Sequence, residues 1–369
     1  MAANKGNRVK IKLRLIGICI LTMLCTTSCW DNVELENRAF VTAMAIDKND
    51  SGNFITAMEI PLISSEKSVI MGKDIKITVD RSVSSAIYGA DILTDKSLYL
   101  GLMKLAVLSE DILDDEKMFR KVIEALAWDK DISRKLIILS SKTDALKAVE
   151  SETQEEKLIG TYIATYYKKN NPSLVYRQDL DRLSRAFAED GLAVIPAVSY
   201  EEERLIFSGA AVCENYSLKG WLGSDEFKGL LWVYSQAEGA ALHWGEGEEY
   251  TAIGIDKCKA HMDFYEAEGE IYARINVDVK ARINELPVNN KPSALQIKEK
   301  AEEAVKAQIN TAYEALYNNM GVDGFNLLSE MRKKSPSLYK IYFENMAMDF
   351  KNIPVVINMD MAVNSTSLE

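Results

Sequence analysis

Residues 271–279 read IYARINVDV, and every second side chain in this stretch is apolar. Successive side chains of an extended chain point to opposite faces, so a period of two predicts a strand with one buried and one exposed face. The same alternation extends over residues 249–286, which therefore predict two or three long antiparallel strands. The buried face is predicted to carry Ile271, Ala273, Ile275, Val277 and Val279.

The segment after this predicted sheet has the pattern of a long helix. Ser293 and Gln296 form a capping-box signature, in which the Ser hydroxyl accepts a hydrogen bond from a helical amide and the Gln side chain reaches back. Residues 293–319 are therefore predicted to form one helix that lies across the sheet. Its buried face would carry Ile297, Ala301, Val305, Ile309, Ala312 and Leu316.

Further elements are predicted on both sides of this sheet and helix. A strand at 205–212 and a helix at 224–235 come before them. Helices at 323–334 and 338–350 come after them. The last predicted strand has its apolar residues on one face, at Val355, Ile357, Met359 and Met361.

The N-terminal half alternates between strand-like and helix-like patterns. Residues 39–47 (AFVTAMAID) and 54–61 are predicted strands, and the polar stretch 48–53 between them predicts a hairpin turn. Helical spacing follows at 80–93 and at 114–128, and the apolar runs at 98–108 and 134–139 are typical of buried strands. Helices that alternate with buried strands predict an α/β layer.

Charge density peaks at residues 199–204 (SYEEER), between two apolar stretches. We therefore predict an N-terminal region at 29–203, made of one or two α/β subdomains, and a C-terminal domain at 204–369 with the antiparallel sheet and the helix 293–319. The predicted fold class is α+β (mixed α/β), multi-domain, with sheets flanked by helices.

The first 28 residues have the layout of a secretory signal peptide. Five Lys and Arg residues, all within residues 5–14, precede the apolar run 15–24. This run is shorter than the roughly 20 apolar residues that a membrane-spanning helix needs, but it suits a signal peptide. Without residues 1–28 the chain has 39 basic and 55 acidic side chains, a net charge of −16. Such a surface repels phosphate backbones and anionic lipid headgroups, which argues against nucleic-acid binding and against a polybasic membrane patch.

Cys29 follows the two small residues Thr27 and Ser28 at the end of this segment. Small residues before a cysteine are typical of bacterial lipoproteins, in which the thiol takes a diacylglyceryl group. Cys25 fits less well because Leu24 precedes it directly. We predict that Cys29 is the lipid attachment site, and an unmodified secreted protein is the alternative. Two acyl chains would hold the protein stably, since each buried methylene contributes about 0.8 kcal/mol.

The remaining cysteines and both histidines give no pattern for chemistry. Cys213 and Cys258 are predicted to be buried free thiols or a disulfide without a functional role. Cys258 and His261 lie three positions apart, so in a strand they point to opposite faces and cannot share a metal ion. His243 has no partner at ligand spacing. No catalytic or phosphate-binding motif occurs, so we expect no catalytic residues, no metal and no cofactor. Trp221, Leu222 and Trp232 could form a contact surface, with core packing as the other interpretation.

From Cys29-Trp30-Asp31 and Glu34-Leu35 onward, the chain resembles the Ger(x)C family, the lipoprotein C subunits of bacterial spore germinant receptors. The order and spacing of several blocks carry the resemblance, which covers essentially the whole chain after Cys29. This chain departs from the family pattern at Thr26, where Leu is usual, and at Gly101-Leu102, where many members have His. The further blocks are LMKLAVLSE (102–110), DKDISR (129–134), FSGAAV (207–212), LKGWL (218–222) and EFKGLLW (226–232).

The resemblance implies a lipoprotein on the outer face of the spore inner membrane that assembles with a polytopic A subunit and a transporter-like B subunit. It also implies three α/β domains without enzymatic activity. Trp30 and Asp31 would then lie at headgroup level, where an indole is well placed. The competing interpretation is a solute-binding lipoprotein that captures a small nutrient in a cleft between domains. It predicts saturable nutrient binding by the isolated protein, whereas the receptor-subunit interpretation predicts none.

Overall fold

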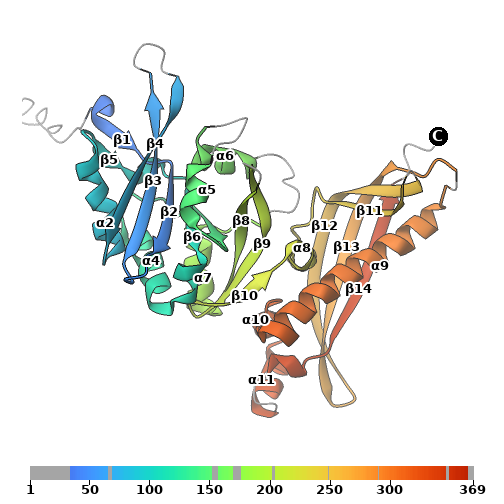
Figure 1. Ribbon diagram of the computed structural model, residues 1–369. Coiled ribbons are helices and arrows are strands. Elements are labelled where there is room, and N and C mark those ends of the chain that lie inside the picture. Colours follow the sequence, from blue (N-terminus) through green and yellow to red (C-terminus); the bar gives the residue numbers. More distant parts are fainter. Residues whose placement is uncertain are drawn as a thin grey trace, which may run out of the picture.

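The computed structural model describes residues 34–64, 69–151, 157–168, 176–201, 204–247, 249–289, 291–345 and 349–364. In this part of the chain the strands form three sheets, of eight, four and two strands. Figure 1 shows the eight-stranded sheet in the N-terminal half and the four-stranded sheet, crossed by a long helix, in the C-terminal half. The predicted signal peptide, residues 1–28, lies outside the described residues.

The eight-stranded sheet has the order β10-β9-β8-β7-β6-β2-β3-β4. Its central strands β2, β6, β7 and β8 pair in parallel, and antiparallel strands extend the sheet on both sides. Every residue of β6 and β7 is buried, as expected for parallel strands covered on both faces. The strands are β2 (Ala43–Lys48), β3 (Phe54–Ile63), β4 (Ile70–Asp80), β6 (Leu105–Ser109), β7 (Ile137–Ser141), β8 (Leu192–Glu201), β9 (Arg204–Glu214) and β10 (Ser217–Leu222).

Helices cover the two faces of this sheet unequally. One face packs against α2 (Val83–Gly89), α3 (Glu110–Asp114), α4 (Glu116–Trp128) and α7 (Leu180–Glu189). The other face packs against the shorter helices α5 (Ala145–Glu150) and α6 (Ile159–Tyr166). Helix α4 confirms the predicted amphipathic segment, because its buried residues include Phe119, Val122, Ile123 and Leu126.

The C-terminal half packs its helices on one face of the four-stranded sheet, and a single core lies between them. Helix α9 (Ala294–Tyr313) crosses this face and continues as the π-helical segment η4 (Glu314–Met320). The strands are β11 (Ala241–Glu246), β12 (Glu249–Ala267), β13 (Glu270–Glu285) and β14 (Val355–Asn364), and the other helices are α8 (Ser224–Val233), α10 (Leu327–Lys334) and α11 (Pro336–Asn345).

The patterns that predicted this half are confirmed. Every second residue of β13 from Ile271 to Val279 is buried, and β12 pairs with β13 in the antiparallel sense. Ser293 caps α9, and both hydrogen bonds of its capping box with Gln296 are present. The predicted α+β fold class, with sheets flanked by helices, is therefore correct.

Residues 39–47 were predicted to form one strand. In the structure they instead contribute to two sheets. Its start belongs to β1 (Arg38–Phe40), which pairs in parallel with β5 (Ser97–Tyr99), whereas β2 begins at Ala43. Between them the Thr42 amide donates to the Glu59 carbonyl. The chain changes hydrogen-bonding partner here, and a pattern of apolar residues cannot reveal such a change because the apolar residues continue from one strand into the next.

The predicted division between residues 203 and 204 falls inside a pair of neighbouring strands. Strands β8 and β9 pair in the antiparallel sense from Leu192↔Glu214 to Glu201↔Arg204, so the larger sheet continues across this position. The two halves contact each other further along the chain, where helix α8 follows strand β10 and packs on helix α9. The domain boundaries and the number of domains stay predictions.

Candidate functional site

The predicted lipid attachment residue Cys29 and its neighbours Trp30 and Asp31 lie outside the described residues, which begin at Glu34. Their roles at the membrane therefore stay predictions. Among the helices of the described ranges, none combines the length and the apolar character needed to cross a bilayer.

Cys213 and Cys258 are buried free thiols, one of the two states predicted for them. They belong to different cores, Cys213 to the N-terminal sheet and Cys258 to the C-terminal sheet. Burial raises the pKa of both thiols, that of Cys258 to about 12, so neither is ionised near neutral pH. His261 lies on the exposed face of the strand whose other face buries Cys258, as the alternation predicted. The described residues contain no group of three potential ligands that could hold a metal ion.

Leu222 and Trp232 are core residues, which confirms the packing interpretation for both. The indole Nε1 of Trp232 donates to Gln308 Oε1 at 2.8 Å and so joins α8 to α9. Trp221 is partly buried, and its Nε1 donates to Glu110 Oε1 at 2.7 Å, which joins β10 to α3. The tryptophans thus connect elements within the protein.

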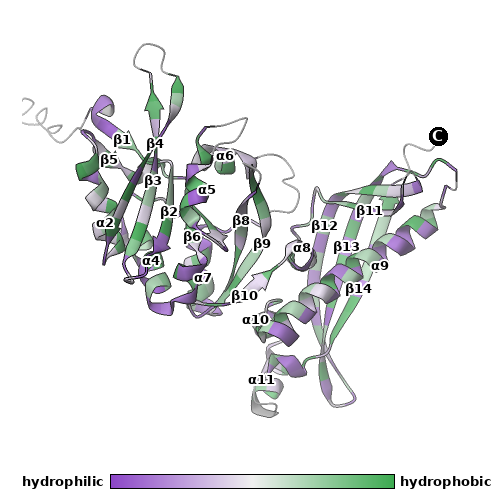
Figure 2. Cartoon of the chain, in the orientation of Figure 1, coloured by the Kyte–Doolittle hydropathy of each residue, from purple (hydrophilic) through white to green (hydrophobic). Residues whose placement is uncertain are grey.

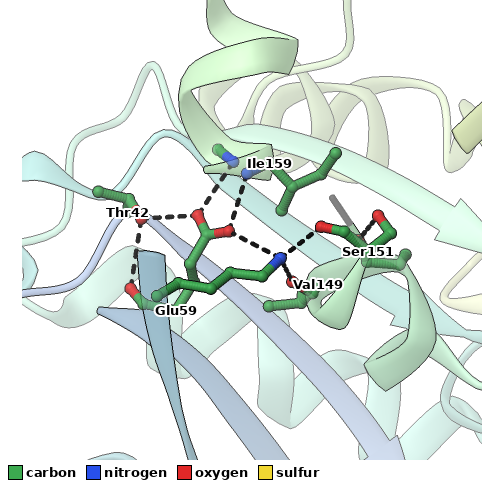
Figure 3. Close-up of polar contacts among 8 residues, drawn as sticks. Thr42, Glu59, Val149, Ser151 and Ile159 are labelled. Atoms are coloured by element: carbon green, nitrogen blue, oxygen red, sulfur yellow. Dashed lines mark hydrogen bonds and ion pairs between the residues drawn. The ribbon is translucent and has the colours of Figure 1, made fainter. Parts of the chain in front are cut away.

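The most buried charged group is the carboxylate of Glu59 on β3, whose side chain has 0% exposure. Its Oε1 accepts from the Thr42 hydroxyl at 2.7 Å and from the Gly160 amide at 3.2 Å. Its Oε2 accepts from the Ile159 amide at 2.8 Å. The two amides belong to the first turn of α6, so Glu59 occupies the position of a helix cap (Figure 3). A carboxylate is favourable there because the N-terminus of a helix carries partial positive charge.

Lys73 on β4 extends this network to helix α5. Its Nζ lies 3.5 Å from Glu59 Oε2 and its side chain has 5% exposure. The same ammonium donates to the Val149 carbonyl at 2.7 Å and to the Ser151 carbonyl, at the C-terminus of α5 (Figure 3). A cation is favourable at this helix end. The pair thus fastens α5 and α6 to the sheet.

Sequence reasoning missed this network, although one signal was present. Glu59 interrupts the apolar strand 54–61, and a charged residue at a buried strand position needs partners. Those partners could not be named, since the Ile159 amide lies 100 positions away.

A second carboxylate, that of the partly buried Asp323, caps α10. Its Oδ1 accepts from the Tyr317 hydroxyl at 2.5 Å and from the Leu327 amide at 2.8 Å, and its Oδ2 accepts from the Leu328 amide at 2.9 Å. Burial is the main cause that raises the pKa of Asp323 above its ordinary value. The hydrogen bonds that it accepts act in the opposite direction and only partly offset the burial.

A cavity of about 280 Å³ lies where the two halves of the molecule meet. Gln178 lines it, is buried, and its Oε1 has no hydrogen-bond partner within the described part of the chain. Asp190 lies on the same wall, and Asp190 Oδ1 is 3.8 Å from Arg332 Nη2 of α10. This polar cavity is where a small solute would fit under the solute-binding interpretation. Its polar lining comes from Tyr176, Gln178, Asp190, Tyr234, Gln236 and Asn326.

Two domain families account for nearly all of the described chain. Residues 31–200 match the family described as the spore germination protein N-terminal domain. Residues 208–367 match the family described as spore germination B3/GerAC like, C-terminal. Residues 201–207 separate the two matches.

Curated proteins of Bacillus subtilis (strain 168) are similar over most of their length. Spore germination protein B3 is 22% identical over 282 residues, covering 73% of this chain and 74% of that protein. Spore germination protein YndF is 23% identical over 296 residues, covering 69% and 71%, and spore germination protein KC is 20% identical over 305 residues, covering 74% and 75%. The crystal structure of the GerBC protein has the same fold, with a TM-score of 0.59, 17% identity, and coverage of 90% of this chain and 99% of that one.

Proposed function

Because this chain belongs to the family of germinant receptor C subunits in spore germination, we propose that it is a non-catalytic lipoprotein subunit of a nutrient germinant receptor. In this proposal Cys29 carries the lipid, and the protein assembles with the membrane-embedded A and B subunits on the outer face of the spore inner membrane. Its contribution is to bind protein partners and so to permit the response to nutrient.

The observation that carries this proposal is the extent of the two family matches. Together they begin at residue 31, two residues after Cys29, and end at residue 367. The part of the chain that follows the predicted signal peptide is therefore almost entirely receptor-subunit sequence.

The buried charges support a structural body in preference to a catalytic one. The Glu59 carboxylate accepts hydrogen bonds from a hydroxyl and from two amides of α6, and Asp323 likewise accepts from a hydroxyl and from two amides of α10. A carboxylate with these contacts is held as a helix cap and is poorly placed to exchange protons with a substrate.

A lipid tether allows weak contacts to be sufficient for binding to membrane partners, because it keeps the protein close to them. Binding of a second site within one assembly depends on the effective concentration, which for short tethers reaches about the millimolar range. A rigid ectodomain anchored at its first residue would therefore bind partner loops with individually modest interfaces.

The test is co-purification of the tagged chain from detergent-solubilised spore membranes, followed by cross-link mapping. We expect the A and B subunits in the purified complex, and cross-links that join their outward-facing loops to this chain. Deletion of the chain should abolish nutrient responses that depend on those subunits and leave nutrient-independent germination intact. Recovery of the chain alone from membranes that contain both subunits would contradict the proposal.

The cavity lined by Gln178 gives the solute-binding alternative a defined place. Titration calorimetry of the purified protein against the cognate nutrient distinguishes the two functions. The receptor-subunit proposal predicts no saturable heat. A saturable heat that Gln178→Leu abolishes would favour nutrient capture in this cavity, and conversion of the nutrient would favour an enzyme.

A further inference from the structure

Strand β14 forms one edge of the four-stranded sheet and lacks the features that protect such an edge (Figure 1). Its sequence, VVINMDMAVN, contains no Pro, Gly, Lys or Arg, and Asp360 is its one charged residue. It pairs with β13 from Ala273↔Val355 to Arg282↔Asn364 without a shift of register. An edge strand that is long, regular and mostly apolar can pair with a strand of another chain.

The edge strands at the other margins of the two larger sheets carry protective features. The pairing of β4 with β3 is irregular, and β4 contains the charged residues Lys73, Asp74 and Lys76. The pairing of β10 has a register shift beside Lys219. Strand β11 has six residues, and Gly245 in it has a φ of +115°. Bulges, charges and short length all hinder pairing with another chain, so β14 differs from the other three edges.

The two faces of the four-stranded sheet offer no comparable surface. Helices cover one face and share a single core with it. The opposite face carries exposed polar side chains, among them Lys259, His261 and Asp263 of β12. Figure 2 accordingly shows apolar and polar colour along the long strands β12 and β13. The edge of β14 is therefore the part of this sheet that is open for pairing.

The backbone of β14 presents hydrogen-bonding groups at this edge. The Ala273 amide of β13 donates to the Pro354 carbonyl at 3.0 Å, so every second residue from Pro354 onward bonds to β13. The residues between them direct their amides and carbonyls to the open edge. These edge-facing residues are Val355, Ile357, Met359, Met361 and Val363. In the described part of the chain, the Met361 amide donates to Glu302 Oε1 at 3.0 Å, and the other edge-facing backbone groups have no hydrogen-bond partner.

We propose that two copies of this chain associate through their β14 edges, in an antiparallel pair that joins the two four-stranded sheets into one continuous sheet. This inference goes beyond the proposed function, and it requires neither the lipid at Cys29 nor the A and B subunits. An extended segment of another protein is the occupant that would replace the second copy.

The sequence of β14 is self-complementary in this arrangement. With Met359 on the twofold axis, Val355 lies opposite Val363 of the second copy. In the same register Ile357 lies opposite Met361 of the second copy. The edge-facing residues of both copies then exchange hydrogen bonds along the whole strand. Their side chains lie on the face that the helices cover, so apolar side chains meet apolar side chains.

The charge of β14 also suits a second copy. In this register Asp360 of one copy lies opposite Asn358 of the other, and the amide can donate to the carboxylate. A slip of two residues would place the two Asp360 side chains opposite each other, and like charges in that position destabilise paired strands. Lys298 Nζ, which lies 2.9 Å from Asp360 Oδ1, further reduces the repulsion between the copies.

Two side chains of α9 reach the β14 edge and can move aside on pairing. Glu302 and Lys298 are partly exposed, with 18% and 37% exposure of their side chains. Pairing would transfer the Met361 amide from Glu302 to the Ile357 carbonyl of the second copy, so this amide would keep a partner. Glu302 would keep its ion pair with Lys298, whose Nζ lies 3.7 Å from Glu302 Oε1.

The first test measures association of the full-length chain, purified in detergent, by sedimentation equilibrium over a range of concentrations. We expect a reversible dimer. Asn358→Asp places a carboxylate opposite Asp360 at two symmetric positions and should raise the dissociation constant roughly two- to thirty-fold. Asn358→Lys places opposite charges there and should lower it by a similar factor. Asn358 is exposed, so both variants should fold, and their urea midpoints check this.

The second test examines the register by disulfide cross-linking. Directly opposite residues of an antiparallel pair have Cα atoms about 4.5–5.5 Å apart, a separation that a disulfide can bridge. The double variant Asn358→Cys/Asp360→Cys should therefore form a disulfide between two copies. Each single variant should not, because position 358 lies opposite position 360. The parent chain, in which Cys213 and Cys258 are buried, is the control for other thiols.

Several outcomes would overturn the inference and leave the proposed function untouched. A chain that stays monomeric at its highest soluble concentration would exclude the second copy. Single cysteine variants that cross-link as well as the double variant would exclude this pairing, and so would equal effects of Asp and Lys at position 358. A monomer whose β14 cysteines cross-link to an identified A or B subunit would replace the second copy by a segment of that subunit.

Discussion

At the scale of the residue, charged side chains hold the small helices of the N-terminal half at their ends. Asp47 Oδ2 accepts from the Ala145 amide at the start of α5, and Lys73 donates to carbonyls at the end of α5. Glu59 accepts from the start of α6. Each charge has the sign that the helix dipole favours. Helices this short have few residues for packing, so these contacts determine how they sit on the sheet.

We predict that Glu59→Ala lowers the free energy of unfolding by about 3–5 kcal/mol, because it removes the carboxylate that balances the buried charge of Lys73 and accepts from the Ile159 and Gly160 amides. Urea denaturation measures the loss. The matched control is Asp74→Ala, which removes one member of the Asp74–Lys76 pair, a more exposed ion pair also on β4. It should cost no more than about 1 kcal/mol. Equal losses of unfolding free energy in the two variants would show that the Glu59 network stabilises the protein no more than an exposed ion pair does.

The partly buried carboxylate of Asp323 should make stability depend on pH. Its pKa is raised above the ordinary value of 3.8, so the folded state binds this proton more tightly than the unfolded state. The resulting stability is present below the unfolded pKa and is lost as the pH rises through the folded pKa.

We therefore predict that the wild-type protein loses stability relative to Asp323→Asn as the pH rises from about 4 toward neutrality, because the amide does not ionise. Denaturant midpoints at several pH values for both proteins measure the difference in stability. The effects of ionisable groups that both proteins contain cancel in this difference. A difference that is constant with pH, or that changes in the opposite direction, would contradict the raised pKa.

At the scale of the element, the close approach of α8 to α9 fixes the C-terminal half. Gly229 of α8 lies against the Gln308 carbonyl, and an added Cβ would also come within 2.8 Å of the Ala312 Cβ. Three positions along α8, Trp232 donates to the Gln308 side chain. The missing side chain of Gly229 therefore allows the contact that buries Trp232.

Gly229→Ala should destabilise the protein by about 1–2 kcal/mol, the range for overpacking a tight contact. In an uncrowded helix the same change would stabilise by up to about 1 kcal/mol, so the sign of the effect is informative. Thermal or urea denaturation measures it, and tryptophan fluorescence should report a changed environment of Trp232. Lys228→Ala, on the neighbouring residue, should have little effect. A stabilised Gly229→Ala variant would show that the helices can separate without cost.

At the scale of the whole molecule, the two halves meet around α8 and at the cavity lined by Gln178, while the start of the described chain lies at the other end of the N-terminal half (Figure 1). An anchor at Cys29 would therefore place the N-terminal half next to the membrane. The C-terminal half would then be held away from the lipid and available to partner loops.

We predict that Cys29→Ala moves the protein from the membrane fraction to the soluble fraction, because it removes the two acyl chains proposed to hold the protein at the bilayer. Fractionation followed by immunoblotting measures the distribution. Cys213→Ala, which removes a buried thiol, should remain with the membrane. If Cys29→Ala stays membrane-bound after a high-salt wash, another element must hold the protein.

Elements with a strong local period could be predicted from the amino-acid sequence. The buried face of β13 and the capping box of α9 follow from side-chain geometry within a few residues, and both are observed. Strand β14 was also predicted as a strand, with Met361 on its buried side. Helices α5 and α6 were not predicted, because short helices flanked by polar segments have little periodicity of their own. Helix α7 was also missed, although its buried residues Leu180, Leu183 and Phe187 follow helical spacing.

By itself the sequence determined the alternating strands, the long capped helix, the mixed α+β class and the family resemblance, since these depend on neighbouring residues or on the order of short blocks. Only the tertiary structure decided which strands pair, which charges are buried, and which apolar residues remain uncovered. Strand β14 pairs in parallel with β13 from Ala273↔Val355 onward, and Glu59 meets an amide 100 positions away. Contacts over such separations depend on how the whole chain closes its loops, and a local pattern contains no information about that closure.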